Sequence, residues 1–227
     1  RTLKSFIVKM WRSFIMPSFK HKPTGKRIFF AHIPRTAGRF VEANLLWKND
    51  FEWDDVHLDN GLGVMSKVNG IEIAHYHRGH YEKYLDVKDI PHFSIVRNPI
   101  NRFISSSIYI KRVYEECQEL MEDPMMFSSM LENMPFEESV NWFRPQVDFM
   151  SDKTHIWKFE DCMGKEFFSW LSGIVGIDLE FDDNIEYPTS KDEHYKDSRL
   201  EATPKLIHNL KTLYRKDIEQ FYPELAA

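Results

Sequence analysis

Short apolar segments alternate with helical patterns along this chain, and this alternation constrains the fold more than any other sequence feature. Residues 27–33 and 92–97 read as short buried strands, and each is followed within a few residues by a helical pattern. Strands that alternate with helices predict a parallel sheet covered on both faces. We therefore expect an α/β fold with a central parallel sheet flanked by helices, and ligands bound beyond the carboxyl ends of its strands.

The remaining pattern supplies further strands and helices and suggests where the domain begins. Residues 70–75 and 154–159 read as additional strands, and residues 203–221 as a last amphipathic helix. The 227 residues suit one globular domain. We divide the chain into a basic amphipathic helix with a linker, residues 1–22, and a single domain, residues 23–227.

Charge is distributed unevenly and limits the classes of partner. The net charge is −5, yet every charged side chain before Glu42 is a Lys or an Arg. An acidic body with a basic first quarter is not typical of nucleic-acid binders, and predicts one local anion site. No apolar run is long enough to span a membrane. The basic helix at residues 3–15 suits either a membrane surface or packing on its own domain, and we expect the packing.

The segment "IPRTAGRF" connects the first predicted strand to its helix and is a candidate anion-binding loop. Backbone N–H groups at a helix start point toward a bound anion, and a glycine lets the backbone approach it closely. No Walker sequence is present, which disfavours an ATPase or GTPase. The alternative is an ordinary turn with two surface arginines. The predicted binding residues are Arg35, Thr36, Ala37, Gly38, Arg39 and Phe40.

A second candidate anion site follows the strand at residues 92–97. Arg97 stands at the strand end, and Asn98 and Pro99 are typical of a helix start. Arg97 and Ser105 together offer a guanidinium fork and a hydroxyl donor to one phosphate. The alternative is that Arg97 and Arg102 pair with acids while the serines face solvent.

These two motifs carry a specific resemblance. "HIPRTAG" resembles the 5′-phosphosulfate loop of the sulfotransferases that use 3′-phosphoadenosine 5′-phosphosulfate (PAPS), and "VRNPINRFISS" resembles their 3′-phosphate motif. The order and spacing are most similar to the Golgi-type carbohydrate sulfotransferases and their bacterial relatives. The chain departs from that pattern at Arg35, where Lys is usual, at Arg39, where Thr or Ser is usual, and at Asn98, where Asp is usual. The resemblance implies a P-loop-like domain.

Histidines cluster after the predicted strand at residues 70–75. His75, His77 and His80 suit a general base, a metal site or simple hydrogen bonding at a loop. The resemblance implies a base near the acceptor hydroxyl, and counting back from Arg97 favours His75, then His77. No nearby acid completes a metal set, so we expect no metal.

The resemblance implies in-line transfer of a sulfuryl group from PAPS to a hydroxyl, with a carbohydrate as acceptor and adenosine 3′,5′-bisphosphate as product. His75 or His77 would be the base, and Arg35 would stabilise the developing charge. Weaker acceptor-site candidates are His80, Glu160, Arg144 and Gln146. The alternative is an inactive nucleotide-binding or partner-binding protein on the same fold. We expect a cytoplasmic enzyme, with a trimmed Golgi luminal domain as the alternative.

Overall fold

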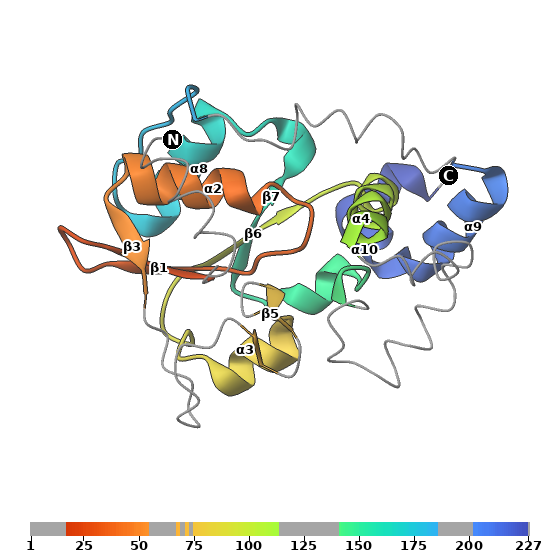
Figure 1. Cartoon of the computed structure of the whole chain (residues 1–227), viewed down its shortest axis with the longest axis horizontal. Coiled ribbons are helices and arrows are strands. Elements are labelled where there is room, and N and C mark those ends of the chain that lie inside the picture. The colour runs from red at the N-terminus through yellow and green to blue at the C-terminus, as the bar shows by residue number, and fades with distance from the viewer. Residues whose placement is uncertain are drawn as a thin grey trace.

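A computed structural model of the chain describes residues 17–54, 67–68, 71–72, 75–113, 141–185 and 202–226 (Figure 1). The predicted helix at residues 3–15 lies outside these ranges. Within them, no helix combines the length and the apolar character that crossing a membrane requires.

The central sheet confirms the α/β fold class but is mixed. Its strands are β1 (Ser18–His21), β2 (Arg27–Phe30), β3 (Phe51–Trp53), β6 (His92–Val96) and β7 (Thr154–Lys158), in the order β3-β1-β2-β6-β7. The pairs β2–β6 and β6–β7 are parallel, whereas β1 is antiparallel to both of its neighbours. The prediction of a parallel sheet therefore holds for the part that carries the site, and among these five strands β1 runs in the opposite direction.

The boundary predicted at residue 22 falls inside a β-hairpin. The turn between β1 and β2 is closed by His21, whose N–H donates to the Lys26 carbonyl at 2.8 Å and whose carbonyl accepts from the Gly25 N–H at 2.8 Å. Gly25 has a φ of 70°, which suits a glycine. Residues Ser18–His21 thus belong to the sheet and not to a linker. A four-residue strand with one fully buried apolar side chain, Phe19, is too short to stand out in the sequence.

The strand predicted at residues 70–75 is not part of the central sheet. Its described portion, β5 (Ile71–Glu72), pairs antiparallel with β4 (Lys67–Val68) in a separate two-stranded sheet. His77 is the N-cap of helix α3 (Arg78–Tyr84), so it does not extend a strand. The histidine cluster therefore lies at the start of a helix.

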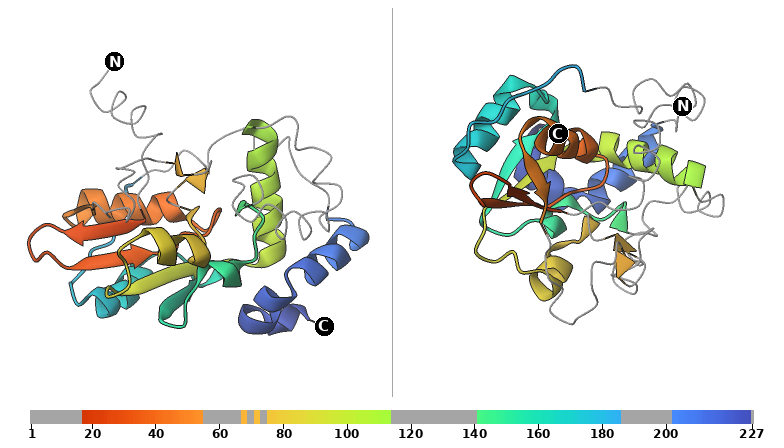
Figure 2. Two further views of the ribbon diagram at one scale, coloured as in Figure 1. Left: turned by 90° about the horizontal axis from the view of Figure 1, so that it is seen from below. Right: turned by 60° about the vertical axis from the view of Figure 1, so that its left-hand side comes forward.

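Helices cover the sheet and extend beyond its carboxyl end (Figures 1 and 2). Besides α3, the described α-helices are α2 (Gly38–Ala43), α4 (Pro99–Val113), α8 (Lys165–Val175), α9 (Pro204–Leu213) and α10 (Arg215–Phe221). Helix α2 continues as a π-helical turn at Asn44–Lys48. Single 3₁₀ turns lie at Gln146–Phe149, Phe159–Asp161 and Pro223–Leu225.

The last helix was predicted to be continuous from 203 to 221 and is divided at Tyr214. The Tyr214 side chain is fully buried, and its hydroxyl donates to the Phe143 carbonyl at 2.8 Å. Tyr214 takes a φ of −100° and a ψ of 25°, outside the helical values, and α10 continues from it in a new direction. Thr203 caps α9 by accepting from the Leu206 N–H, as its place at the predicted helix start suggests.

Two apolar clusters on opposite faces fix the sheet between helices. Phe30 and Ile95 face α2 and α8, where they join Val41 and Leu171. Phe29 points to the other face, where α3 supplies Tyr81. This alternation along β2 is what a strand buried on both faces requires. The predicted arrangement of helices on both faces is confirmed.

Candidate active site

The loop between β2 and α2 is tightly wound. Arg35 and Ala37 both take positive φ angles, 68° and 67°, which are uncommon for residues with a side chain. Thr36 between them is fully buried, and its hydroxyl donates to the Ile33 carbonyl at 2.8 Å. The single hydroxyl proton of Thr36 is thus used inside the loop. Thr36 holds the shape of the loop.

Gly38 is required by its neighbour His32. A Cβ atom at Gly38 would lie 1.8 Å from Nε2 of His32, well inside van der Waals contact. The His32 ring cannot move aside easily, because it stacks on Phe30 with centroids 4.7 Å apart and contacts the His75 ring at 4.5 Å. The close approach predicted at this glycine is therefore to an imidazole within the protein.

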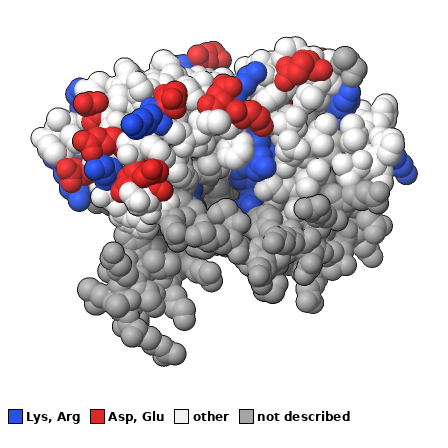
Figure 3. Space-filling view, turned by 90° about the horizontal axis from the view of Figure 1, so that it is seen from above, with Lys and Arg blue, Asp and Glu red and all other residues white. Residues whose placement is uncertain are grey.

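The two anion-binding motifs meet in space. Nε of Arg35 donates to Oγ of Ser105 at 3.0 Å, and Nη1 of Arg97 donates to the Arg35 carbonyl at 3.1 Å. These residues come from two parallel strands and the segments that follow them. The two strands are neighbours in the sheet, so the segments that follow their carboxyl ends lie side by side. On one face of the molecule, Lys and Arg side chains gather along a hollow of the described surface (Figure 3).

The remaining loop residues divide between surface and core. Arg39 is exposed. Burial is the main cause that lowers the pKa of His32, and the charges of His75 and then Arg39 lower that pKa further. Phe40 packs against Phe168 and Phe181, at centroid distances of 6.1 and 5.9 Å. The Phe40 ring thus packs against the apolar core.

Glu160 organises the start of α4. One of its carboxylate oxygens accepts from the Asn98 N–H at 2.8 Å, and the other accepts from the Tyr222 hydroxyl at 2.8 Å. Asn98 in turn caps α4, because its Oδ1 accepts from the N–H groups of Ile100 and Asn101. The predicted Asn98 cap is confirmed. Glu160 supports this strand-to-helix junction, and the prediction that it orients base or acceptor is not supported.

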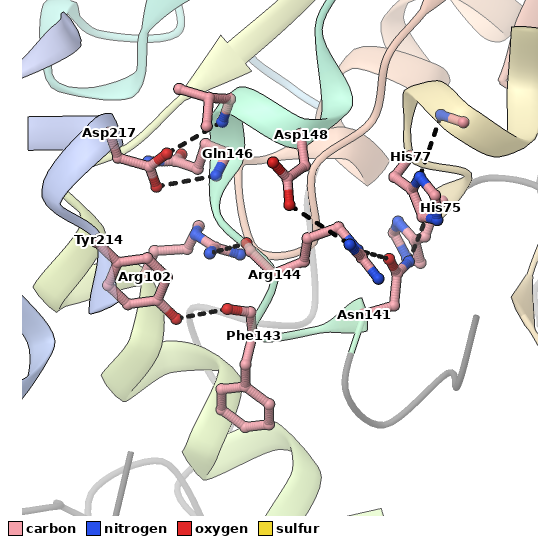
Figure 4. A network of polar contacts seen from close by, with 12 residues as sticks. His75, His77, Arg102, Asn141, Phe143, Arg144, Gln146, Asp148, Tyr214 and Asp217 are labelled. Carbon is pink, nitrogen blue, oxygen red and sulfur yellow. Dashed lines mark hydrogen bonds and ion pairs between the residues drawn. The ribbon is translucent and has the colours of Figure 1, made fainter. Parts of the chain in front are cut away.

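The segment from Asn141 to Asp148 connects both halves of the site (Figure 4). At one end, the Asn141 amide donates to the His75 carbonyl at 2.5 Å and accepts from Nε of Arg144 at 3.0 Å. At the other end, Gln146 bonds to the backbone of Arg97. Gln146 is fully buried with its amide used on protein, so the prediction that it lines the acceptor site is not supported.

Arg102 and Arg144 hold this segment from within. Arg102 is fully buried and donates to the carbonyls of Trp142 and Arg144, at 3.2 and 2.6 Å. Its guanidinium also lies over the Tyr214 ring, 5.4 Å from the centroid. Arg144 is buried and bonds to Asn141 and Asp148. Arg102 thus binds carbonyl groups. The alternative considered from the sequence was that it pairs with an acidic side chain.

His75 and His77 use Nδ1 in opposite ways. Nδ1 of His75 lies 3.1 Å from the His32 carbonyl oxygen, which can only accept, so this nitrogen donates a proton. Nδ1 of His77 receives the Gly79 N–H at 3.2 Å, so this nitrogen accepts. A neutral imidazole carries one proton. In neutral His75 the lone pair is therefore on Nε2, whereas neutral His77 carries its proton there.

His80 is a buried, weak base. It stacks on His77 with centroids 4.5 Å apart, and burial is the main cause that lowers its pKa to about 4. Arg144 and Lys83 lower that pKa further by charge repulsion. A side chain that stays neutral at physiological pH, and binds protons this poorly, does not suit a general base.

Burial of His80 predicts a loss of stability in acid. Unfolding restores the ordinary pKa of about 6.5, so the unfolded chain binds more protons below that pH. The contribution of neutral His80 to the free energy of unfolding is complete above pH 6.5. It is lost as pH falls toward 4, by about 1.4 kcal/mol per pH unit. Denaturant titrations should show a flatter pH dependence of the unfolding free energy in His80→Phe. His155→Phe, an exposed position on β7, is the control, and equal slopes in both variants would contradict this assignment.

Among the described residues, no group of three His, Cys, Asp or Glu side chains is arranged to hold a metal ion. Sequence reasoning missed the parts played by His32, Asn141 and Asp217. His32 is the first residue of the quoted segment "HIPRTAG", but nothing in the spacing of His32 or Asn141 shows that each contacts His75.

Comparison with known proteins finds one distant structural likeness. No family model matches the sequence, and no curated protein matches it. Among solved structures, the chain is similar to a sulfotransferase from Alicyclobacillus acidocaldarius, with 15% identity and a TM-score of 0.37. The match covers 64% of this chain and 57% of that protein, less than two thirds of its length. A likeness of this size assigns no activity.

Proposed function

We propose that this protein is a sulfotransferase that transfers a sulfuryl group from PAPS to a hydroxyl group of a carbohydrate acceptor. The observation that carries the proposal is the contact between the two anion-binding motifs, in which Arg35 bonds to Ser105 and Arg97 bonds to the backbone of Arg35. The resemblance requires these motifs to hold the two ends of one nucleotide. The adjacent parallel strands β2 and β6 bring the two loops side by side, and what supports the proposal is that the side chains that meet there are two arginines and a serine.

The residues present fit a doubly phosphorylated nucleotide. Arg35 and the backbone of residues 36–40 would hold the 5′ end, and Arg97 with Ser105 would hold the 3′-phosphate. Guanidinium groups suit phosphate oxygens because they donate two parallel hydrogen bonds. PAPS, when bound, supplies a sulfuryl group on a good leaving group, and adenosine 3′,5′-bisphosphate remains.

His75 is the residue we assign as the general base. It takes the proton of the acceptor hydroxyl at Nε2, which carries the lone pair, while Nδ1–H stays bonded to the His32 carbonyl. That bond fixes the ring orientation and stabilises the imidazolium that forms. Arg35 places positive charge where negative charge develops on the leaving phosphate, and costs no reorganisation because its loop is fixed. No metal is needed for these steps.

Calorimetric titration with adenosine 3′,5′-bisphosphate, beside ATP with magnesium, tests the proposal. We expect micromolar binding of the bisphosphate, and a 10- to 100-fold weaker affinity in Arg97→Ala, since about 1.5–3 kcal/mol is lost with a charged hydrogen bond. Arg215→Ala is the matched control, because Arg215 makes an exposed pair with Glu219 on α10. Folded protein that binds no bisphosphate would refute the proposed function.

A binding protein without transfer activity is the second candidate. The observation that favours it is the bond from Arg35 to Ser105, which uses one of the five N–H donors of the side chain that transfer requires. Bisphosphate binding combined with no transfer from labelled PAPS to any of a panel of carbohydrate acceptors would select this candidate.

A further inference from the structure

Gln146 bonds to the backbone of Arg97 at two points. Its Oε1 accepts from the Arg97 N–H at 2.9 Å, and its Nε2 donates to the Arg97 carbonyl at 2.8 Å. The last pair in register between β6 and β7 is Val96 with Lys158. Arg97 lies one residue beyond that pair, so the Gln146 amide takes the place that a neighbouring strand would otherwise fill. It holds both peptide groups of the residue that carries the guanidinium.

Helix α10 fixes Gln146 in turn. The Asp217 carboxylate is fully buried and accepts from the N–H groups of Gln146 and Val147, at 2.9 and 3.0 Å. These two bonds hold the 3₁₀ turn that begins at Gln146. The backbone of Gln146 is therefore fixed by Asp217 (Figure 4), while its amide is held by the two bonds to Arg97.

The side chain of Arg97 is restrained as well. Its guanidinium lies over the Phe159 ring, 4.7 Å from the centroid, and its Nη1 bonds to the Arg35 carbonyl. Burial lowers the pKa of this guanidinium. A partly desolvated cation held at both ends is pre-organised, and it loses little conformational freedom when an anion binds.

We propose that Gln146 is the positioning residue for the 3′-phosphate, and that it sets the preference for nucleotides that carry a 3′-phosphate over those with a 5′-phosphate alone. This inference rests on the proposed function, because it assigns Arg97 to the 3′-phosphate. It replaces the acceptor-site role predicted for Gln146 from sequence. Gln146 does not touch the nucleotide, and it acts through the backbone of Arg97.

Two nucleotides separate positioning from general stability. Adenosine 3′,5′-bisphosphate and adenosine 5′-phosphate are each titrated into the full chain carrying Gln146→Met or Gln146→Glu. Met removes both bonds at similar volume, whereas Glu keeps the acceptor and loses the donor. We expect the Kd of the bisphosphate to rise about tenfold and that of the 5′-phosphate to change less than about twofold, so that the preference for the bisphosphate falls. Where Gln146→Met folds poorly, Gln146→Glu carries the comparison.

Asn49→Leu is a matched control. The Asn49 amide accepts from the Glu180 N–H at 2.7 Å and donates to the Glu180 carbonyl at 2.9 Å, the same two-point bond at a place away from the anion-binding motifs. It should lower the melting temperature and leave the ratio of the two Kd values unchanged. An unchanged ratio in the folded Gln146 variants overturns the positioning role while the proposed function stands. Wild-type protein that binds no bisphosphate overturns both.

Discussion

His75→Ala is expected to lose about 100- to 10,000-fold in the rate of sulfuryl transfer, with the affinity for adenosine 3′,5′-bisphosphate unchanged. This is the range that a positioned general base contributes. The loss follows from the hydrogen bond between Nδ1 of His75 and the His32 carbonyl, which leaves the proton-accepting lone pair on Nε2. The rate is measured with labelled PAPS and the acceptor found by screening, and the affinity by calorimetry.

His77→Ala is the control for this variant. Nδ1 of His77 caps α3 by accepting from the Gly79 N–H, so its removal should lower stability by about 1 kcal/mol. Turnover per folded molecule should fall far less than in His75→Ala. If His77→Ala abolished transfer while His75→Ala retained it, the assignment of the base from the two Nδ1 contacts would be wrong.

Gly38→Ala should disrupt both the stability and the nucleotide site. The added Cβ atom would lie 1.8 Å from Nε2 and 2.0 Å from Cε1 of His32, and that ring is confined by Phe30 and His75. Extra atoms in a packed interior cost about 1–3 kcal/mol, and the upper end applies here because a ring and not a flexible chain must move. Denaturant unfolding measures the stability, and titration with the bisphosphate measures the site.

A second substitution should rescue this variant. His32→Ala removes the ring that the new methyl group meets, so Gly38→Ala should cost much less in the His32→Ala background than alone. Gly173→Ala is the control, because Gly173 lies in α8, where an added Cβ atom would meet no other atom within 4 Å, and alanine is the better helix former. Equal stabilities of Gly38→Ala and Gly173→Ala would show that the loop and the His32 ring move aside at no cost, and would contradict this prediction.

The parts of the fold that were predicted correctly from the sequence are those with a strong pattern among neighbouring residues. The strand at 92–96 with its Asn98 cap, the strand at 154–158 and the loop after β2 were expected, because apolar runs and capping residues act over a few neighbours. The strand β1 was missed for the opposite reason. Its four residues include Lys20 and His21, and only pairing with β2 and β3 makes them a strand.

The site was predicted as a set of motifs and not as a network. Ser105 was predicted to act with Arg97, whereas in the structure it bonds to the Arg35 side chain, and Arg97 bonds to the Arg35 carbonyl. Gln146 was assigned to the acceptor because its segment resembles one in related enzymes, and Glu160 was assigned there as a carboxylate that could orient the base or substrate. Both bind backbone groups of the strand-to-helix junction at residues 97–98, and a sequence pattern carries no record of which peptide group a side chain will reach.

The mixed sheet also bears on the order of folding. The hairpin of β1 and β2 joins neighbours in sequence, so its loop closes at little entropic cost. The contacts that make the site are distant, since the Arg97–Arg35 bond spans 62 residues and the Arg35–Ser105 bond spans 70. Contacts of this kind form slowly, because a long chain segment must be ordered before they are made. We expect the hairpin to form early and the proposed nucleotide site to assemble only with the parallel pairs β2–β6 and β6–β7, so that a chain arrested early in folding has the hairpin without that site.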